Sequence, residues 1–599
     1  MRTARLLTIG LLLLALSPAP NAQMTSVGRI SGTVRDSSGA VIPGATITVI
    51  NVATNLKRTT TTDEDGFYTV TNLPIGTYLV TAEQRGFKRT AQSDNVLTAD
   101  ARLTVDLTLE PGDLSETVEV SAATGETVNV ASGEVARVID SQQVQNLALN
   151  GRNYIQLLSL IPGVALITDD QLELSTSLAT NQQSINGNRG QMNNLTVDGG
   201  FNLQSGSNAS QINNVGIDFI QEVKIQTANF SAEYGRNAGA QINVVTKSGT
   251  NEFHGSAFEF LRNDKLDARN FFAPIRPPLR YNDFGYSLGG PIVKNRFFFF
   301  GGQEWKKIRR LSNPVVRTVP TLAELNGDFS YRLRGPDGIV GTADDGFLRD
   351  PSKSGSCGLV NGQPVRTACF PGNIIPASRI TADGRAIASV YRTMIGLATS
   401  YIDAPVGNNI TFQQPNPLDF REDILRLDYR FNERHSIYGR YIHDNNDLID
   451  PFGTFINSQL PTIPSHRLRP GTSLQVSHTW IIRPTLINEG KATGAWVSQR
   501  IPPASEYWKR ETYGFTFQQL FTGGGPYENS IPDTSITGFA SFNGAARSLV
   551  SPTTDITFSD TLTWVHGNHT VKTGLVIIRN RIDQNGRTTY AGQVSFSTS

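Results

Sequence analysis

The sequence predicts an all-β-dominated chain that ends in a large antiparallel transmembrane β-barrel, and three observations support this fold class. The mean hydropathy is −0.24, which excludes a bundle of membrane helices. Gly (55 residues) and Phe (30 residues) are abundant, as in proteins with many strands and polar turns. The C-terminal half alternates apolar and polar side chains, as strands do between lipid and water.

Composition and motifs also exclude several functions. Lys and Arg number 53 against 52 Asp and Glu, so the chain has no basic excess and no nucleic-acid partner is expected. It has no P-loop, no G-x-S-x-G motif, no dinucleotide-binding glycine motif and no zinc-protease motif, and its His residues are scattered. We therefore expect no enzyme, no catalytic residues, no metal site and no cofactor.

Residues 1–22 are predicted to be an export signal peptide. Arg2 and Arg5 precede an apolar core, Leu6–Leu16, which is too short to span a bilayer but suits a signal sequence. Ala22 is the expected cleavage position. An uncleaved anchor and a buried helix are the alternatives.

Residues 27–111 are predicted to form a small β-sandwich of six or seven short strands separated by turn residues. The segments that carry a resemblance are Gly28–Val34, Ile42–Ala45, Asp65–Tyr68 and Leu73–Tyr78. They resemble the carboxypeptidase regulatory-like domain, a family grouped with carbohydrate-binding-like folds. Asp63 and Asp65 could ligate Ca²⁺, but an acidic hairpin turn is the commoner structure.

Residues 113–122 are predicted to be an extended linker. The segment resembles the TonB box, a short periplasmic strand that pairs with the energising protein TonB. A strand of this kind offers backbone groups for β-augmentation, so it needs little side-chain information. A simple linker strand is the alternative. The contact residues implied by the resemblance are Glu116, Thr117, Val118, Glu119 and Val120.

Residues 123–248 combine short helices with strands. Ser141 is expected to cap a helix through Leu147, and Asn153 to cap a second helix with apolar residues at helical spacing. The Asn-rich stretch Ser184–Asn214 is expected to form polar loops that face water. Strands are expected at Thr196–Asp198, Val223–Gln226 and Gln241–Thr246.

This region resembles the plug of TonB-dependent receptors, and most closely the Oar-like branch. The motifs are Asn150–Tyr154, Ile185–Arg189, Leu195–Gly199, Phe230–Arg236 and Val244–Thr250. The plug is an α+β domain that fills the barrel lumen. Its charged residues are interpreted as structural ion-pair partners rather than direct ligand contacts. The candidate residues are Arg152, Asn186, Arg189, Asp198, Glu233 and Arg236.

Residues 249–599 are predicted to be the N-terminal part of an outer-membrane β-barrel. Leu425, Leu427 and Tyr429 alternate with Arg426 and Asp428, and a tight turn follows. The resemblance to the Oar-like barrel continues through Phe253–Gly255, Gly289–Ile292, Asn326–Phe329 and Pro371–Arg379. Plugged transporters have 22 strands, whereas about ten residues per strand and long loops leave room for about nine to twelve. We therefore expect a truncated barrel, from a fragment or an incomplete gene product.

Two long irregular stretches, Thr318–Thr411 and Pro502–Asp555, are expected to be outer loops. Cys357 and Cys369 lie close together in the first, which favours a disulfide over a metal site and leaves two free thiols as the alternative. Asp337 and the pair Asp344-Asp345 could hold Ca²⁺, although their spacing is not that of an EF-hand.

The resemblance implies a receptor in the outer membrane with its N-terminal domain in the periplasm. It would bind an extracellular siderophore, oligosaccharide or peptide and import it with energy from the TonB complex. Its other partner would be outer-membrane lipid. An adhesion or secretion-scaffold protein of the same architecture is one alternative. A secreted carbohydrate-binding or carbohydrate-active protein is the other.

Overall fold

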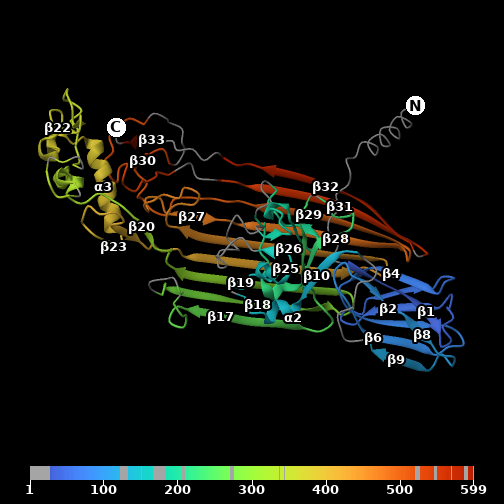
Figure 1. Ribbon diagram of the computed structural model, residues 1–599. Coiled ribbons are helices and arrows are strands. Elements are labelled where there is room, and N and C mark those ends of the chain that lie inside the picture. The colour runs from blue at the N-terminus through green and yellow to red at the C-terminus, as the bar shows by residue number, and fades with distance from the viewer. Residues whose placement is uncertain are drawn as a thin grey trace, which may run out of the picture.

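The structure, a computed structural model, describes residues 27–121, 133–149, 151–165, 183–205, 210–235, 237–269, 271, 276–335, 337–340, 342, 345–519, 527–545, 550–567, 569–585 and 591–597. The expected signal peptide lies outside these residues. A broad curved sheet of long strands dominates the molecule, with the N-terminal sandwich at one end and a small helical subdomain at the other (Figure 1). None of the described helices is long and apolar enough to cross a membrane.

The N-terminal sandwich consists of two facing sheets. One sheet has the order β4-β1-β7 with β8 also paired to β1, and the other has the order β3-β2-β5-β6-β9. Ile47, Val49 and Val80 are fully buried between them, and Tyr68 donates a hydrogen bond to the carbonyl of Val105 at 2.7 Å. The strands are β1 (Val27–Asp36), β2 (Thr46–Asn51), β3 (Lys57–Thr61), β4 (Phe67–Pro74), β5 (Gly76–Glu83), β6 (Arg89–Leu97), β7 (Arg102–Thr104), β8 (Leu107–Leu109) and β9 (Thr117–Ser121).

The plug is built on a five-stranded sheet of order β10-β15-β16-β13-β14. Its elements are β10 (Val135–Asp140), α2 (Ser141–Asn146), η1 (Tyr154–Leu160), β11 (Val164–Ala165), β12 (Ser184–Ile185), η2 (Gly190–Met192), β13 (Asn194–Val197), β14 (Gly200–Phe201), η3 (Ile217–Phe219), β15 (Ile220–Ala228) and β16 (Gln241–Thr246). Its core continues into the barrel wall through Phe300, Ile424 and Ile442, which places the plug on the inner side of the large sheet.

Two local predictions for the plug need correction. The N-cap of α2 is Asp140 and not Ser141, because the Asp140 carboxylate accepts a hydrogen bond from the amide of Gln143 at 2.9 Å. Asn153 does cap the next element, accepting from the amide of Ile155 at 3.0 Å. That element is a 3₁₀-helix, which ends at Leu160 before the Pro162-Gly163 turn.

The long strands form one antiparallel sheet that is not closed among the described residues, with β17 and β32 as its two edges. Its strands are β17 (His254–Asn263), β18 (Leu279–Val293), β19 (Phe297–Arg310), β25 (Leu418–Arg430), β26 (His435–Asp450), β27 (Ser465–Leu468), β28 (Gly471–Arg483), β29 (Leu486–Val497), β31 (Thr553–His566) and β32 (His569–Ile582). The predicted fold class, strand-dominated with a plug and a partial barrel, is confirmed.

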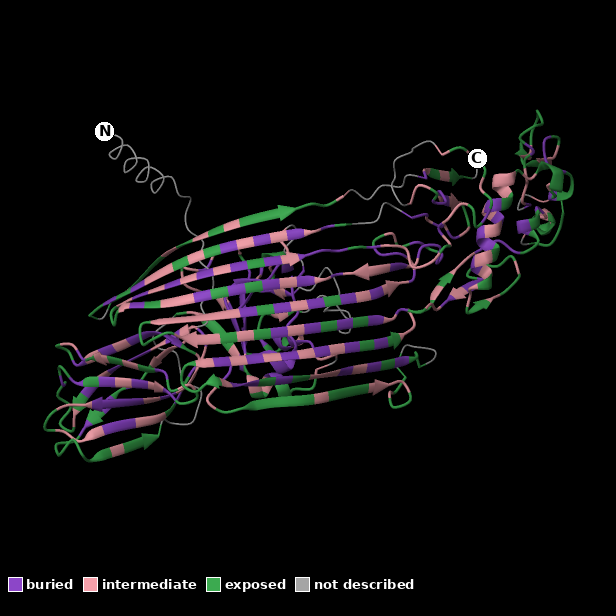
Figure 2. Cartoon of the chain, turned by 180° about the vertical axis from the view of Figure 1, so that it is seen from behind, coloured by how far each residue is buried: buried purple, intermediate pink, exposed green. Residues whose placement is uncertain are grey.

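Side chains along the barrel strands alternate between an outer and an inner face, visible as stripes of burial in Figure 2. On β28, Leu474 and Val476 are 54% and 37% exposed, whereas Gln475 between them is 0% exposed. Aromatic rings lie near strand ends, as in the pairs Phe297–Tyr429 and His435–Trp480. Apolar side chains therefore face outward where lipid would be, and polar side chains face the plug.

The stretches expected to be irregular outer loops are not irregular, because they fold into a compact subdomain. The helix α3, capped by Thr381, packs Val390, Tyr391 and Met394 into a core shared with Phe412 and Phe542. The elements of the subdomain are β20 (Val315–Arg317), η4 (Glu324–Asn326), η5 (Ser330–Arg334), β21 (Gly358–Val360), β22 (Gln363–Val365), η6 (Pro371–Asn373), η7 (Ala377–Arg379), α3 (Ala382–Gly396), β23 (Ser400–Tyr401), β24 (Ile410–Phe412), β30 (Asp533–Ile536) and β33 (Gln593–Phe596).

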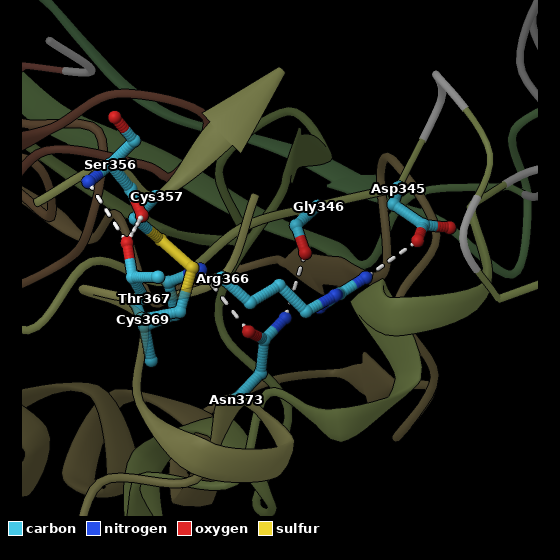
Figure 3. The surroundings of a disulfide bond; sticks show 9 residues. Asp345, Gly346, Ser356, Cys357, Arg366, Thr367, Cys369 and Asn373 are labelled. Carbon is cyan, nitrogen blue, oxygen red and sulfur yellow. Dashed lines mark hydrogen bonds and ion pairs between the residues drawn. A yellow bond between two sulfur atoms is a disulfide. The ribbon is translucent and has the colours of Figure 1, made fainter. Parts of the chain in front are cut away.

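Cys357 and Cys369 are joined by a disulfide with 5.0 Å between their Cα atoms. Ser356 and Thr367 add two hydrogen bonds beside it, at 3.2 and 3.0 Å (Figure 3). Arg366 then pairs with Asp345 at 2.6 Å. Within the described parts of the chain, no group of His, Cys, Asp and Glu has the arrangement of a metal site.

Candidate functional site

Asp198, a buried residue in the turn between β13 and β14, joins the plug to the barrel wall through several contacts. Its backbone has φ +49°, a left-handed conformation that carries the carboxylate toward the wall. Arg440 of β26 contacts one carboxylate oxygen at 2.9 Å, and Arg426 of β25 contacts the other at 3.4 Å. The amide and hydroxyl of Thr246 donate at 2.9 and 2.8 Å. Burial favours the neutral acid, but these two arginines and Thr246 outweigh it and hold the pKa of Asp198 below its usual value.

The backbone carbonyl of Asp198 has three further barrel partners. Gln475 of β28 donates at 2.9 Å, Lys491 of β29 at 3.2 Å and Tyr438 of β26 at 3.3 Å. The following Gly200 lies so close to Gln475 that a Cβ there would be 2.0 Å from its side-chain oxygen. Four neighbouring strands therefore contact one turn of the plug, and Gly200 lets the turn approach them.

Arg152 makes a second plug–wall contact. Its guanidinium forms a close ion pair with Asp218 of the plug and lies 3.6 Å from Asp283 of β18. It also lies over the ring of Phe260 of β17, 3.8 Å from the centroid. With two carboxylates and an aromatic face around it, Arg152 joins the plug to the wall.

The Asn-rich stretch faces water only in part: Asn186 and Arg189 are exposed, whereas polar groups at its C-terminal end are buried against barrel carboxylates. The side chain of Asn213 donates to Asp444 at 2.9 Å, and the amide of Asn214 donates to the same carboxylate at 2.8 Å. The amide of Gly216 donates to Glu422 at 3.1 Å. The junction is therefore polar and buried, and its buried groups are paired by these hydrogen bonds.

The other candidate residues lie apart from this junction. Asn186 is exposed in a turn with φ +51°, and its amide donates to the carbonyl of Thr227 at 3.2 Å. Arg189 is exposed. Glu233 pairs with Lys572 of β32 at 3.3 Å, and burial raises its pKa. Arg236 lies outside the described residues.

The TonB-box-like segment is extended, as predicted, but it lies on the sandwich rather than free. Strand β9 pairs in parallel with β6 and ends the sheet, so its other edge points away from the domain. The carboxylate of Glu116 contacts Lys88 at 2.9 Å. Val120 is 46% exposed, and the backbone of β9 is accessible to a partner strand.

The sandwich contacts the plug through the loop that follows β6, a contact that the sequence analysis missed. The carboxylate of Asp100 accepts from the hydroxyl of Tyr234 at 2.7 Å and lies 3.5 Å from the ammonium of Lys224. The amide of Ala99 donates to Glu222 at 2.5 Å. Burial raises the pKa of Glu222 to about 7, with the Ala99 hydrogen bond and Lys224 opposing the rise. No motif in the sequence signals Asp100, which looks like an ordinary turn residue.

Three family models match the chain. The carboxypeptidase regulatory-like domain matches residues 29–110, the TonB-dependent receptor plug domain residues 130–240, and the outer membrane beta barrel domain residues 245–599. The last match covers more than half of the chain. The chain belongs to the TonB-dependent receptor family. Receptors of this family are not enzymes; this chain lies in the outer membrane, with its N-terminal domain on the periplasmic side.

The chain is also similar to several known proteins. The TonB-dependent transporter Oar of Myxococcus xanthus is 31% identical over 302 residues, which are 47% of this chain and 27% of that protein. The siderophore receptor PirA of Acinetobacter baumannii has a TM-score of 0.41 at 12% identity, over 75% of this chain and 48% of its own. The outer membrane transporter YddB of Escherichia coli has a TM-score of 0.42 at 11% identity, over 73% of this chain and 47% of its own. The chain thus spans about a quarter of the curated relative and about half of these solved receptors.

Proposed function

We propose that this receptor binds an extracellular ligand and imports it with energy supplied through TonB. The observation that carries the proposal is the pairing of two features. The plug is held in the barrel at Asp198, and an edge strand with an open backbone, β9, lies on the periplasmic side. A partner strand that pairs with β9 through backbone hydrogen bonds would hold the chain just before the plug begins.

Two routes carry a pull on β9 to the plug. One is the chain itself, which leads from β9 toward β10. The other runs through β6, which pairs with β9, and then through Asp100 and Ala99 to Lys224 and Glu222 on β15. Strand β15 is the neighbour of β16, whose last residue, Thr246, binds the Asp198 carboxylate. Movement of the sandwich would therefore reach the residue that holds the plug.

The ligand would enter from the side of the compact outer subdomain, opposite the sandwich (Figure 1). Siderophores, oligosaccharides and peptides all remain candidate ligands. TonB and the ligand are the proposed partners, and the candidate plug residues are proposed to position the plug rather than to bind the ligand.

Deletion of residues 116–120 in the full-length receptor tests the proposal. We expect uptake of a captured ligand to be lost while ligand binding at the cell surface is retained. The matched control is Glu119→Ala, which keeps the backbone of β9 and should keep most uptake, because β-augmentation depends on backbone groups. Unchanged uptake after the deletion would refute the energising role. It would favour the adhesion alternative.

A further inference from the structure

A cavity of about 630 Å³ lies where the sandwich, the end of the plug sheet and the short-turn ends of the barrel strands meet. Sites for small molecules commonly have volumes of this size. Five cationic side chains line it. Arg426 is paired with Asp428. The other four are Arg58 of β3, Lys247 after β16, Arg296 in the turn between β18 and β19, and Arg430 at the end of β25.

These four cations have no carboxylate within 4.0 Å among the described residues. The arginines donate to backbone carbonyls instead. Arg58 donates to Glu433 at 2.8 Å, Arg430 to Asn55 at 3.5 Å and Arg296 to Arg430 at 3.3 Å. Nε of Arg58 is buried without a hydrogen-bond partner. Backbone carbonyls are neutral, so these contacts do not cancel the positive charges, and Glu433 near Arg58 and Asp218 near Lys247 offset them only in part.

The acidic residues of the same cavity do not compensate them. Asp428 pairs with Arg426 at 3.0 Å, and Glu489 lies 3.6 Å from Lys491. Glu252 also lines the cavity, so its lining holds five cations and three carboxylates. Glu433 lies near Arg58 and Asp218 near Lys247, but neither is a lining residue. Burial and the nearby Arg430 lower the pKa of Arg58 to about 10, as expected where a cation is desolvated beside a like charge.

We propose that this cavity binds a small soluble anion with phosphate or carboxylate groups, held jointly by Arg58 of the sandwich and Arg296 and Arg430 of the barrel. The guanidinium fork suits both groups, because it donates two parallel hydrogen bonds. The anion would replace a like-charge contact between the two domains with an attractive bridge, so its binding favours the docked sandwich. Binding of the anion in this cavity does not require transport.

Calorimetric titration of the detergent-solubilised chain with pyrophosphate and with citrate tests the proposal. We expect saturable binding of at least one anion, and at least tenfold weaker binding in Arg58→Gln and in Arg430→Gln. Arg58→Lys keeps the positive charge but loses the two parallel guanidinium hydrogen bonds, so its affinity for the anion should lie between those of the wild type and Arg58→Gln. Arg35→Gln is the matched control, because Arg35 lies in the same sandwich, is not among the lining residues and donates to the carbonyl of Gly39 at 3.0 Å.

A second readout separates loss of the site from loss of the fold. Hydrogen exchange of residues 51–58 should slow when pyrophosphate is added to the wild type and to Arg35→Gln, and should not change in Arg430→Gln. The absence of saturable binding, or equal binding in wild type and Arg58→Gln, would overturn the proposal. Preferential binding of short-chain phosphatidylglycerol would also overturn it, since the ligand would then be a lipid headgroup.

Discussion

Replacing Asp198 with Asn tests how the plug is held in the barrel. The two side chains have nearly the same shape, and the backbone carbonyl of residue 198 would keep its contacts with Gln475, Lys491 and Tyr438. The change therefore isolates the negative charge. It leaves Arg440, which is 2% exposed and pairs with Asp198 at 2.9 Å, as a buried cation without a carboxylate.

Breaking a buried ion pair from one side costs about 3–5 kcal/mol, because the remaining charge is not solvated. The population of receptors with a released plug should therefore rise about 150-fold to 5,000-fold. Asp428→Asn is the matched control. Its carboxylate also pairs with Arg426, but its side chain is 25% exposed, so we expect a loss of about 1 kcal/mol.

Pulse proteolysis of the plug across a urea series, with the barrel intact, measures this free energy. A double variant that combines Asp198→Asn with Arg440→Met should recover about half of the loss, because it removes the stranded cation. The reasoning is refuted if Asp198→Asn destabilises the plug no more than Asp428→Asn does.

Three further predictions concern the sandwich and the outer subdomain. The pKa of Glu222, about 7 when docked, should fall toward about 4.3 when the sandwich leaves the plug. The sandwich should therefore dock most strongly below about pH 4.3, and docking should weaken as pH rises to 7, by about a hundredfold between pH 5 and pH 8. Hydrogen exchange of residues 97–101 should show this pH dependence in the wild type and lose it in Glu222→Gln. Replacing Cys357 with Ser should destabilise the outer subdomain by about 3 kcal/mol through loop entropy, seen as faster proteolysis there; equal rates would contradict it. Phe542→Ala should cost about 3–5 kcal/mol of subdomain stability by denaturant titration, because its side chain is fully buried against Tyr391; a loss below about 1 kcal/mol would show that this core is not cooperative.

Local patterns predicted the elements whose cause is local. The Asn153 cap and the alternation along β25 and β28 depend on neighbours in sequence, so they could be foreseen. The burial of Asn213 could not, because its partner Asp444 lies 231 positions away. For the same reason no pattern placed β9 beside β6 or Asp100 against the plug.

The outer subdomain could have been predicted in part, because its sequence contains the signal of an amphipathic helix. Thr381 followed by Ala386, Val390 and Met394 has the capping residue and the spacing of an amphipathic helix. The many Gly, Pro and Asn residues around it suggested loops throughout. Those residues form the short connections of a folded unit whose core includes residues from both long stretches.

The central claim is that the outer face of the large sheet meets hydrocarbon while its inner face meets the plug. Single cysteines at 474, 475 and 476, labelled with a fluorophore in the full-length receptor in liposomes, test it most directly, because the two native cysteines are joined in a disulfide. Bromine-labelled lipid tails should quench the labels at positions 474 and 476 and leave the label at 475 bright. Equal quenching at all three positions, or quenching at 475 alone, would contradict the account.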